Sequence, residues 1–174
     1  MSISNCSRYG ERIAAWCEAR IGQKVGNGEC WTLANDALTA VAEECRARNQ
    51  EPCVPSRGYI HGALIYTYVP PKPSDPPGGI EAAGIARGDI IQFLTAHMRS
   101  RDGMSNSYLG APDHTAVIIA VDRGGVMKVL EQNVGSTKIV MEGTVDMSGM
   151  VSGEVRVFRP VGENWLVPLD LSWP

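Results

Sequence analysis

The chain has 174 residues, 44% hydrophobic and 20% charged, a composition that excludes a collagen-like, low-complexity or largely disordered protein. The formal net charge is −3 and neither sign forms a run of five, so the charge pattern does not favour a nucleic-acid partner. The length favours one domain over residues 1–174. Because the sequence shows no signal peptide and no run of eighteen apolar residues, we expect a cytoplasmic location without membrane contact.

The five cysteines are odd in number and never form a C-x-x-C pair. In a reducing compartment most of them should be free thiols, and one of them could be reactive. The three histidines are scattered along the chain, so we expect neither a metal site nor a cofactor.

Two amphipathic helices are predicted in the first third of the chain. The first covers Arg8–Ile21, where apolar residues recur at steps of three and four. The second follows the turn Gly26–Gly28 and carries an apolar stripe ending in a polar stretch: Leu33, Ala34, Ala37, Leu38, Val41 and Cys45. Cys30 falls in the first turn of that helix, on the face turned toward the protein.

Strands are predicted after the helices. A β-branched and aromatic segment, Gly58–Val69, stops at Pro70. The segment Pro70–Gly79 has five prolines and is predicted to be a stiff surface loop. The PxxP spacing in Pro70–Pro77 allows an SH3-type partner, although an ordinary surface crossover explains the composition as well.

Further strands are predicted at 90–94, 114–121, 126–133, 137–141 and 155–158, with the polar segment Arg99–Pro112 as a loop. Helices followed by hairpin-rich strands predict an α+β fold in which the N-terminal helices pack on an antiparallel β-sheet.

Cys30 is the candidate nucleophile. At a helix N-terminus, unpaired N–H groups and the helix dipole favour a thiolate, and the same groups can hold an oxyanion. Position alone is weak evidence, because a buried structural cysteine is the commoner role, and this is how we interpret the other four.

His114 is the candidate base, because it opens a strand after the long polar segment. His61 lies in a strand-like stretch and is interpreted as a core or rim histidine. His97 could line a cleft.

The register of one hairpin predicts the partner of His114. If Val121 faces Val126 across the turn, His114 faces Asn133 and Glu131 is its diagonal neighbour. A polar strand end is costly to bury unless its groups are bonded, so Asn133 or Glu131 could orient the imidazole. The register favours Asn133, and a solvated strand end is the alternative.

Four short blocks occur in order along the chain: GNGECWTLA from Gly26, GDIIQF from Gly88, HTAV from His114 and LEQN from Leu130. This pattern resembles the papain-like cysteine hydrolases of the CHAP and NlpC/P60 type. With VSGEVRVFRP from Val151, the chain is also similar to the papain-like C-terminal domain of fungal myosin-tail-interacting actin-patch adaptors. The order and spacing of the blocks carry the resemblance.

The resemblance implies a papain-like fold with Cys30 as nucleophile, His114 as base and Glu131 or Asn133 as the orienting residue. Such enzymes tend to supply a second oxyanion donor from the loop before the nucleophile, for which Gln23 is the candidate. Cell-wall amidases of this superfamily usually carry a secretion signal or wall-binding module, and neither is seen here. Some fungal adaptors lack the nucleophile, which is present in this chain.

Three functions follow from these patterns. The first is a cysteine peptidase or amidase that cleaves an amide or isopeptide bond in a peptide or protein through a thioester on Cys30. The second is a non-catalytic papain-like module that binds proteins. The third is an injected cell-wall amidase toxin.

Overall fold

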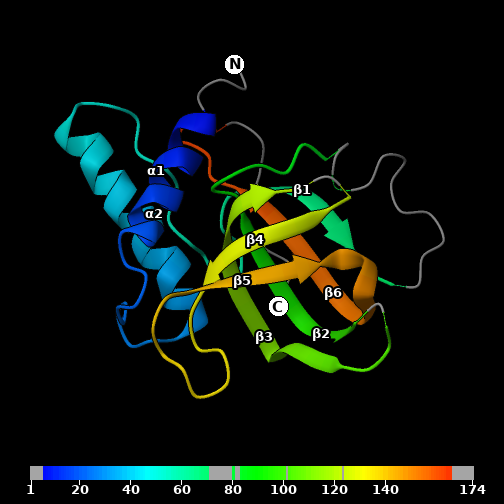
Figure 1. Ribbon diagram of the computed structural model, residues 1–174. Coiled ribbons are helices and arrows are strands. Elements are labelled where there is room, and N and C mark those ends of the chain that lie inside the picture. The colour runs from blue at the N-terminus through cyan, green and yellow to red at the C-terminus, as the bar shows by residue number, and fades with distance from the viewer. Residues whose placement is uncertain (1–5, 71–79, 81–82, 101, 123, 166–174) are drawn as a thin grey trace.

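A computed structural model describes residues 6–70, 80, 83–100, 102–122 and 124–165. In this part of the chain two helices lie side by side against one strongly curved sheet (Figure 1). The predicted α+β class, with N-terminal helices on an antiparallel sheet, is confirmed. Apart from Pro70 itself, the expected SH3-type ligand at Pro70–Pro77 lies outside the described residues.

The helical layer consists of α1 (Cys6–Glu18) and α2 (Cys30–Ala47). The first helix ends three residues before the expected Ile21, and a turn follows in which Gly22 has a φ of 79°. The second helix confirms the predicted apolar stripe, since every one of its members is buried. This stripe packs on the sheet, where it meets Ile90, Val117 and Leu130.

The described sheet has six strands: β1 (Ala63–Tyr68), β2 (Ile90–Arg99), β3 (Asn106–Val121), β4 (Val126–Glu131), β5 (Met141–Asp146) and β6 (Met150–Arg159). Their spatial order is β1-β6-β2-β3-β4-β5, and neighbouring strands are antiparallel. A 3-10 turn, Met147–Gly149, joins β5 to β6. The central strands bury both faces: Ile90 and Val117 face the helices, whereas Ile91 and Ala116 face the curved interior.

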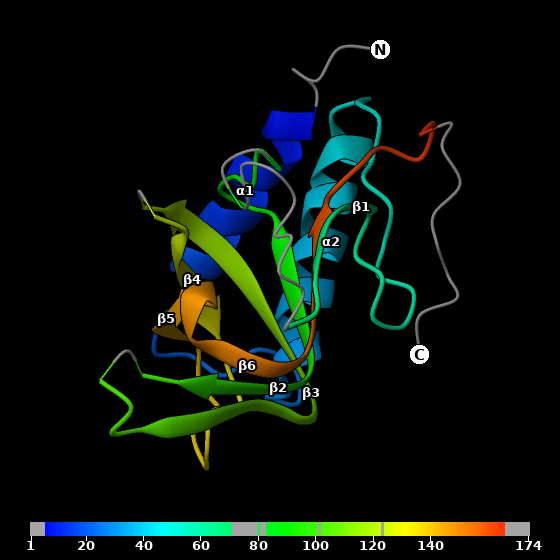
Figure 2. The ribbon, with the colours of Figure 1, turned by 90° about the vertical axis from the view of Figure 1, so that its right-hand side faces the viewer.

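The polar segment Arg99–Pro112 is not the predicted loop. Its second half, from Asn106 onward, belongs to β3, which pairs with β2 as far as Arg99 and Asn106 and forms a long hairpin. Figure 2 shows this hairpin running away from the helices. The expectation failed because a two-stranded ribbon satisfies its backbone hydrogen bonds internally, so exposed polar residues can form it without an apolar pattern.

The strand expected at 137–141 is also wrong. The β5 strand starts at Met141, and the residues before it form only single bridges, Val134 with Thr137 and Ile21 with Val140. The second bridge attaches this segment to the connection between α1 and α2.

Candidate active site

Cys30 is the first residue of α2, as predicted, and its side chain is buried. The preceding residue, Glu29, has an extended backbone and occupies the N-cap position. Its side chain makes no cap hydrogen bond with the helix. The first turn of α2 is therefore not capped by the residue that normally fills that role, and its N–H groups lie beside the thiol.

The Cys30 thiol and the His114 ring are close enough for each to shift the pKa of the other. Burial alone would raise the pKa of Cys30, but the proximity and charge of His114, with a backbone hydrogen bond from Thr115, bring that pKa below its ordinary value. Burial alone would lower the pKa of His114, but Cys30 and Glu131 outweigh it and raise the pKa to about 9. Both shifts favour a thiolate–imidazolium pair.

Glu131 is the orienting partner of His114 in this structure. The His114 Nε2 and Glu131 Oε2 atoms are 2.6 Å apart, and both side chains are buried. Burial makes such a charge-assisted hydrogen bond stronger than one at the surface. Gly143 of β5 makes room for it, because a Cβ at that position would overlap Glu131 Oε1.

The end of β4 explains why Asn133 does not face His114. Val121 pairs with Met127, not with Val126, and an irregularity between Ile118 and Ala120 restores the expected pairing of Val117 with Leu130. The β4 strand then ends at Glu131. Asn133 lies beyond it with a φ of 64°, a left-handed conformation that takes the chain out of the strand. The expectation that Asn133 orients His114 is therefore corrected.

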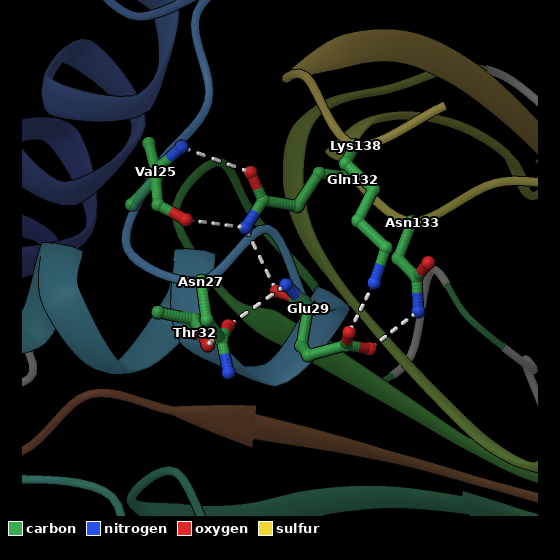
Figure 3. Close-up of polar contacts among 7 residues, drawn as sticks. All are labelled: Val25, Asn27, Glu29, Thr32, Gln132, Asn133 and Lys138. Atoms are coloured by element: carbon green, nitrogen blue, oxygen red, sulfur yellow. Dashed lines mark hydrogen bonds and ion pairs between the residues drawn. The ribbon is translucent and has the colours of Figure 1, made fainter. Parts of the chain in front are cut away.

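Asn133 instead contacts the residue before the nucleophile. Its Nδ2 donates to Glu29 Oε2 at 2.6 Å, and Lys138 forms an ion pair with the other carboxylate oxygen (Figure 3). Both ends of this ion pair are close to half exposed. These contacts of Glu29 connect the segment after β4 to the residue before α2, but solvent screening limits their strength.

Gln132 was not singled out from the sequence. Its side chain is fully buried and bonds the backbone of Val25 and Glu29, on the segment leading to Cys30 (Figure 3). The signal that could have found it was the polar Glu-Gln-Asn run closing an apolar strand, since buried amides need partners.

Tyr59 and Asp113 also lie near the thiol. The Tyr59 hydroxyl donates to Asp113 Oδ2 at 2.7 Å, which raises the pKa of Tyr59. The negative charge of Asp113 opposes the thiolate of Cys30. Asp113 follows a register irregularity between β2 and β3, and such irregularities redirect side chains.

The other histidines stand apart from this cluster. His61 is fully buried, with Ser56 Oγ at 2.9 Å and Gln92 Oε1 at 3.2 Å from its ring nitrogens, which confirms the core interpretation. His97 stacks on Tyr108 in the outer part of the long hairpin and bonds Asn106. Lining a cleft was one option for His97, but the ring contacts two residues of the same hairpin, Tyr108 and Asn106.

Gln23 and the remaining described cysteines also have other surroundings. The Gln23 amide donates to the Ala19 carbonyl oxygen at the surface, 3.3 Å away, so the expected oxyanion donor is engaged by its own helix end. Cys17, Cys45 and Cys53 are buried free thiols. Burial raises the pKa of Cys17 and of Cys53 to about 12, the opposite direction to Cys30.

Within the described residues, no three side chains of the metal-binding types gather closely enough to hold an ion. In the same part of the chain, neither helix combines the length and the hydrophobicity needed to cross a membrane.

The profile of the AIM3/BBC1 cysteine proteinase-fold domain matches residues 3–170. The chain belongs to this family. Within it, the chain is 32% identical to Altered inheritance of mitochondria protein 3 of Debaryomyces hansenii, over 94% of this chain and 17% of the relative. It is 27% identical to an SH3 domain-containing protein of Schizosaccharomyces pombe, over 91% of this chain and 9% of the relative.

The AIM3/BBC1 match confirms the predicted papain-like cysteine proteinase fold and the resemblance to the fungal adaptor domains. The chain spans less than a fifth of the length of these curated relatives. Two crystal structures of Ly7917, one with the hydrolyzing product of MDP, align with 87% of this chain and 62% of theirs at 16% identity. Their TM-scores are 0.48 and 0.46.

Proposed function

We propose that this AIM3/BBC1 domain is a cysteine hydrolase that cleaves an amide or isopeptide bond of a peptide or protein. The observation that carries the proposal is the buried His114 ring, which lies beside the Cys30 thiol and bonds the Glu131 carboxylate. A nucleophile, a base and an orienting group in hydrogen-bond sequence are what acyl transfer through a thioester requires.

The proposed reaction has two steps. The Cys30 thiolate attacks the carbonyl carbon, and the His114 imidazolium gives its proton to the departing amine, leaving a thioester on Cys30. His114, now neutral, takes a proton from a water molecule as that water attacks the thioester carbon. Cleavage of the C–S bond then releases the carboxylic acid and restores Cys30. In both steps the negative oxygen of the tetrahedral intermediate is proposed to bind N–H groups in the first turn of α2, which Glu29 leaves without a side-chain cap.

An activated acyl donor tests this chemistry without knowledge of the natural substrate. We expect p-nitrophenyl acetate to release about one equivalent of nitrophenolate in a burst, with the acetyl group found on Cys30 by peptide mass mapping. Cys30→Ala should abolish the burst, whereas Cys45→Ala should keep it if the protein folds. Acetylation spread evenly over the cysteines would contradict the proposal.

A non-catalytic binding role is the second candidate, because a relative of this domain is named for its SH3 domain and the chain is a small part of each relative. In that case Pro70–Pro77 offers the spacing of an SH3-type ligand. A folded protein whose Cys30 is no more reactive than its other thiols would favour this role.

The free thiols of Cys17, Cys30, Cys45 and Cys53 support a location in a reducing compartment such as the cytoplasm.

A further inference from the structure

The segment Val25–Glu29 carries the backbone into the nucleophile and has no regular secondary structure. Two of its residues, Gly26 and Gly28, have positive φ values of 53° and 87°. A side chain at Gly28 would press on Lys138, so the segment and the strand connection approach each other closely. Its conformation has to be held from outside, because a short loop of this kind fixes little by itself.

One internal contact shapes the start of α2. Asn27 Oδ1 accepts a hydrogen bond from the Glu29 N–H at 3.0 Å and another from the Thr32 hydroxyl at 2.7 Å (Figure 3). These bonds fold the segment onto the first turn of the helix. They do not connect it to the strands that carry His114 and Glu131.

Gln132 makes that connection. Its Oε1 accepts from the Val25 N–H at 3.3 Å, and its Nε2 donates to the Val25 carbonyl oxygen at 3.1 Å and to the Glu29 carbonyl oxygen at 2.8 Å. The side chain is fully buried, so these bonds are shielded from water. Only an amide supplies an acceptor and two donors in this arrangement.

The position of Gln132 in the chain gives these bonds a role in the site. Successive side chains at a strand end point to opposite faces, so Glu131 reaches His114 while Gln132 reaches the segment before Cys30. Two adjacent residues therefore hold the two halves of the thiol–imidazole pair. Any slip of the segment would move the thiol relative to a ring that Glu131 keeps in place.

We infer that Gln132 is a positioning residue, which sets the placement of the Cys30 thiol against the His114 ring by clamping the backbone of Val25 and Glu29. This inference rests on the proposed function. The neighbouring contact of Glu29 with Asn133 and Lys138 holds the same segment from its exposed side and contributes less, because water competes for it.

The test is the pH dependence of iodoacetamide alkylation at Cys30, followed by peptide mass mapping in the full chain. In Gln132→Met, we expect the midpoint of alkylation to rise by about one pH unit and the rate at pH 6.5 to fall about tenfold. Gln23→Met is the matched control, since that amide reaches only Ala19 at the surface, and its profile should overlay the wild type. A residue that only stabilises the fold would not move the midpoint of a folded variant.

Gln132→Glu is the second variant, because it keeps the shape and one hydrogen bond while setting a carboxylate against two carbonyl oxygens. It should move the midpoint in the same direction. Wild-type profiles in folded Gln132→Met and Gln132→Glu, or failure of both variants to fold, would overturn the inference and leave the proposed function standing. If wild-type Cys30 itself titrates as an ordinary thiol, the proposed function fails first.

Discussion

Two buried histidines of this domain differ sharply in chemistry. His61 is enclosed by the hydroxyl of Ser56 and the amide of Gln92, and burial lowers its pKa to about 4. His114 is enclosed by Cys30 and Glu131, and these partners raise its pKa to about 9 despite burial. Ionisable partners, and not depth in the protein, therefore make a histidine fit for proton transfer.

Removal of each imidazole ring should separate the two histidines most clearly. His114→Ala should slow acylation by p-nitrophenyl acetate by about 10²–10⁴-fold, the usual contribution of a general acid–base group. His61→Gln keeps a polar group between Ser56 and Gln92, so the folded variant should retain most of the rate. Stopped-flow burst measurements decide between them, and equal losses in both variants would remove the distinction.

The low pKa of His61 should appear in acid unfolding. In the unfolded chain the His61 ring takes up a proton below its ordinary pKa of 6.5. In the folded chain the ring stays neutral until about pH 4. Stability therefore falls as the pH falls through this interval, by about 3 kcal/mol in total from this group.

Urea unfolding at pH 4, 5 and 6.5 measures that loss. His61→Gln should flatten the dependence, because its side chain takes up no proton. Parallel curves for the variant and the wild type would show that another group controls acid unfolding.

Removal of the carboxylate charge beside His114 should change the pH dependence of the reaction. The pH–rate profile of acylation should rise as the Cys30 thiol ionises and fall as His114 loses its proton near pH 9. Glu131→Gln should shift the falling limb to lower pH and slow the reaction about 10- to 100-fold, which corresponds to one charge-assisted hydrogen bond of about 1.5–3 kcal/mol. Glu142→Gln, an exposed carboxylate on β5, is the control and should leave the falling limb in place.

The smallest effect is expected at Asn133. Asn133→Ala removes a partly exposed contact with Glu29 and leaves the bond between His114 and Glu131 intact. We expect a loss of about fivefold or less, equivalent to about 1 kcal/mol. A loss as large as that of Glu131→Gln would return the orienting role to Asn133.

The sequence predicted the structure best where apolar residues recur with the period of a helix or form a buried strand. The stripe from Leu33 to Cys45 predicted α2 and put Cys30 at its start, because a helix that covers a sheet must bury one face. The outer part of the β2–β3 hairpin, around Asn106, was missed. It is held by backbone pairing, which leaves no apolar pattern in its polar sequence.

The choice between Asn133 and Glu131 depended on finer geometry than pattern provides. The turn between β3 and β4 is one residue longer than assumed, so Val121 pairs with Met127. An irregularity further along the two strands cancels this shift, and Val117 pairs with Leu130 as predicted. The left-handed backbone of Asn133 then ended the strand two residues before the predicted end. Gln132 escaped notice because its partners are backbone atoms distant in sequence, which no side-chain motif records.

The small size of Gly143 has a consequence for comparing members of this family. The strand that bears it supplies no group to the thiol or the imidazole, yet any larger residue there would compete with the Glu131 carboxylate for space. If the proposed function holds, we expect family members that keep a carboxylate at position 131 to keep a glycine opposite Val129, and members without that carboxylate to accept larger residues there.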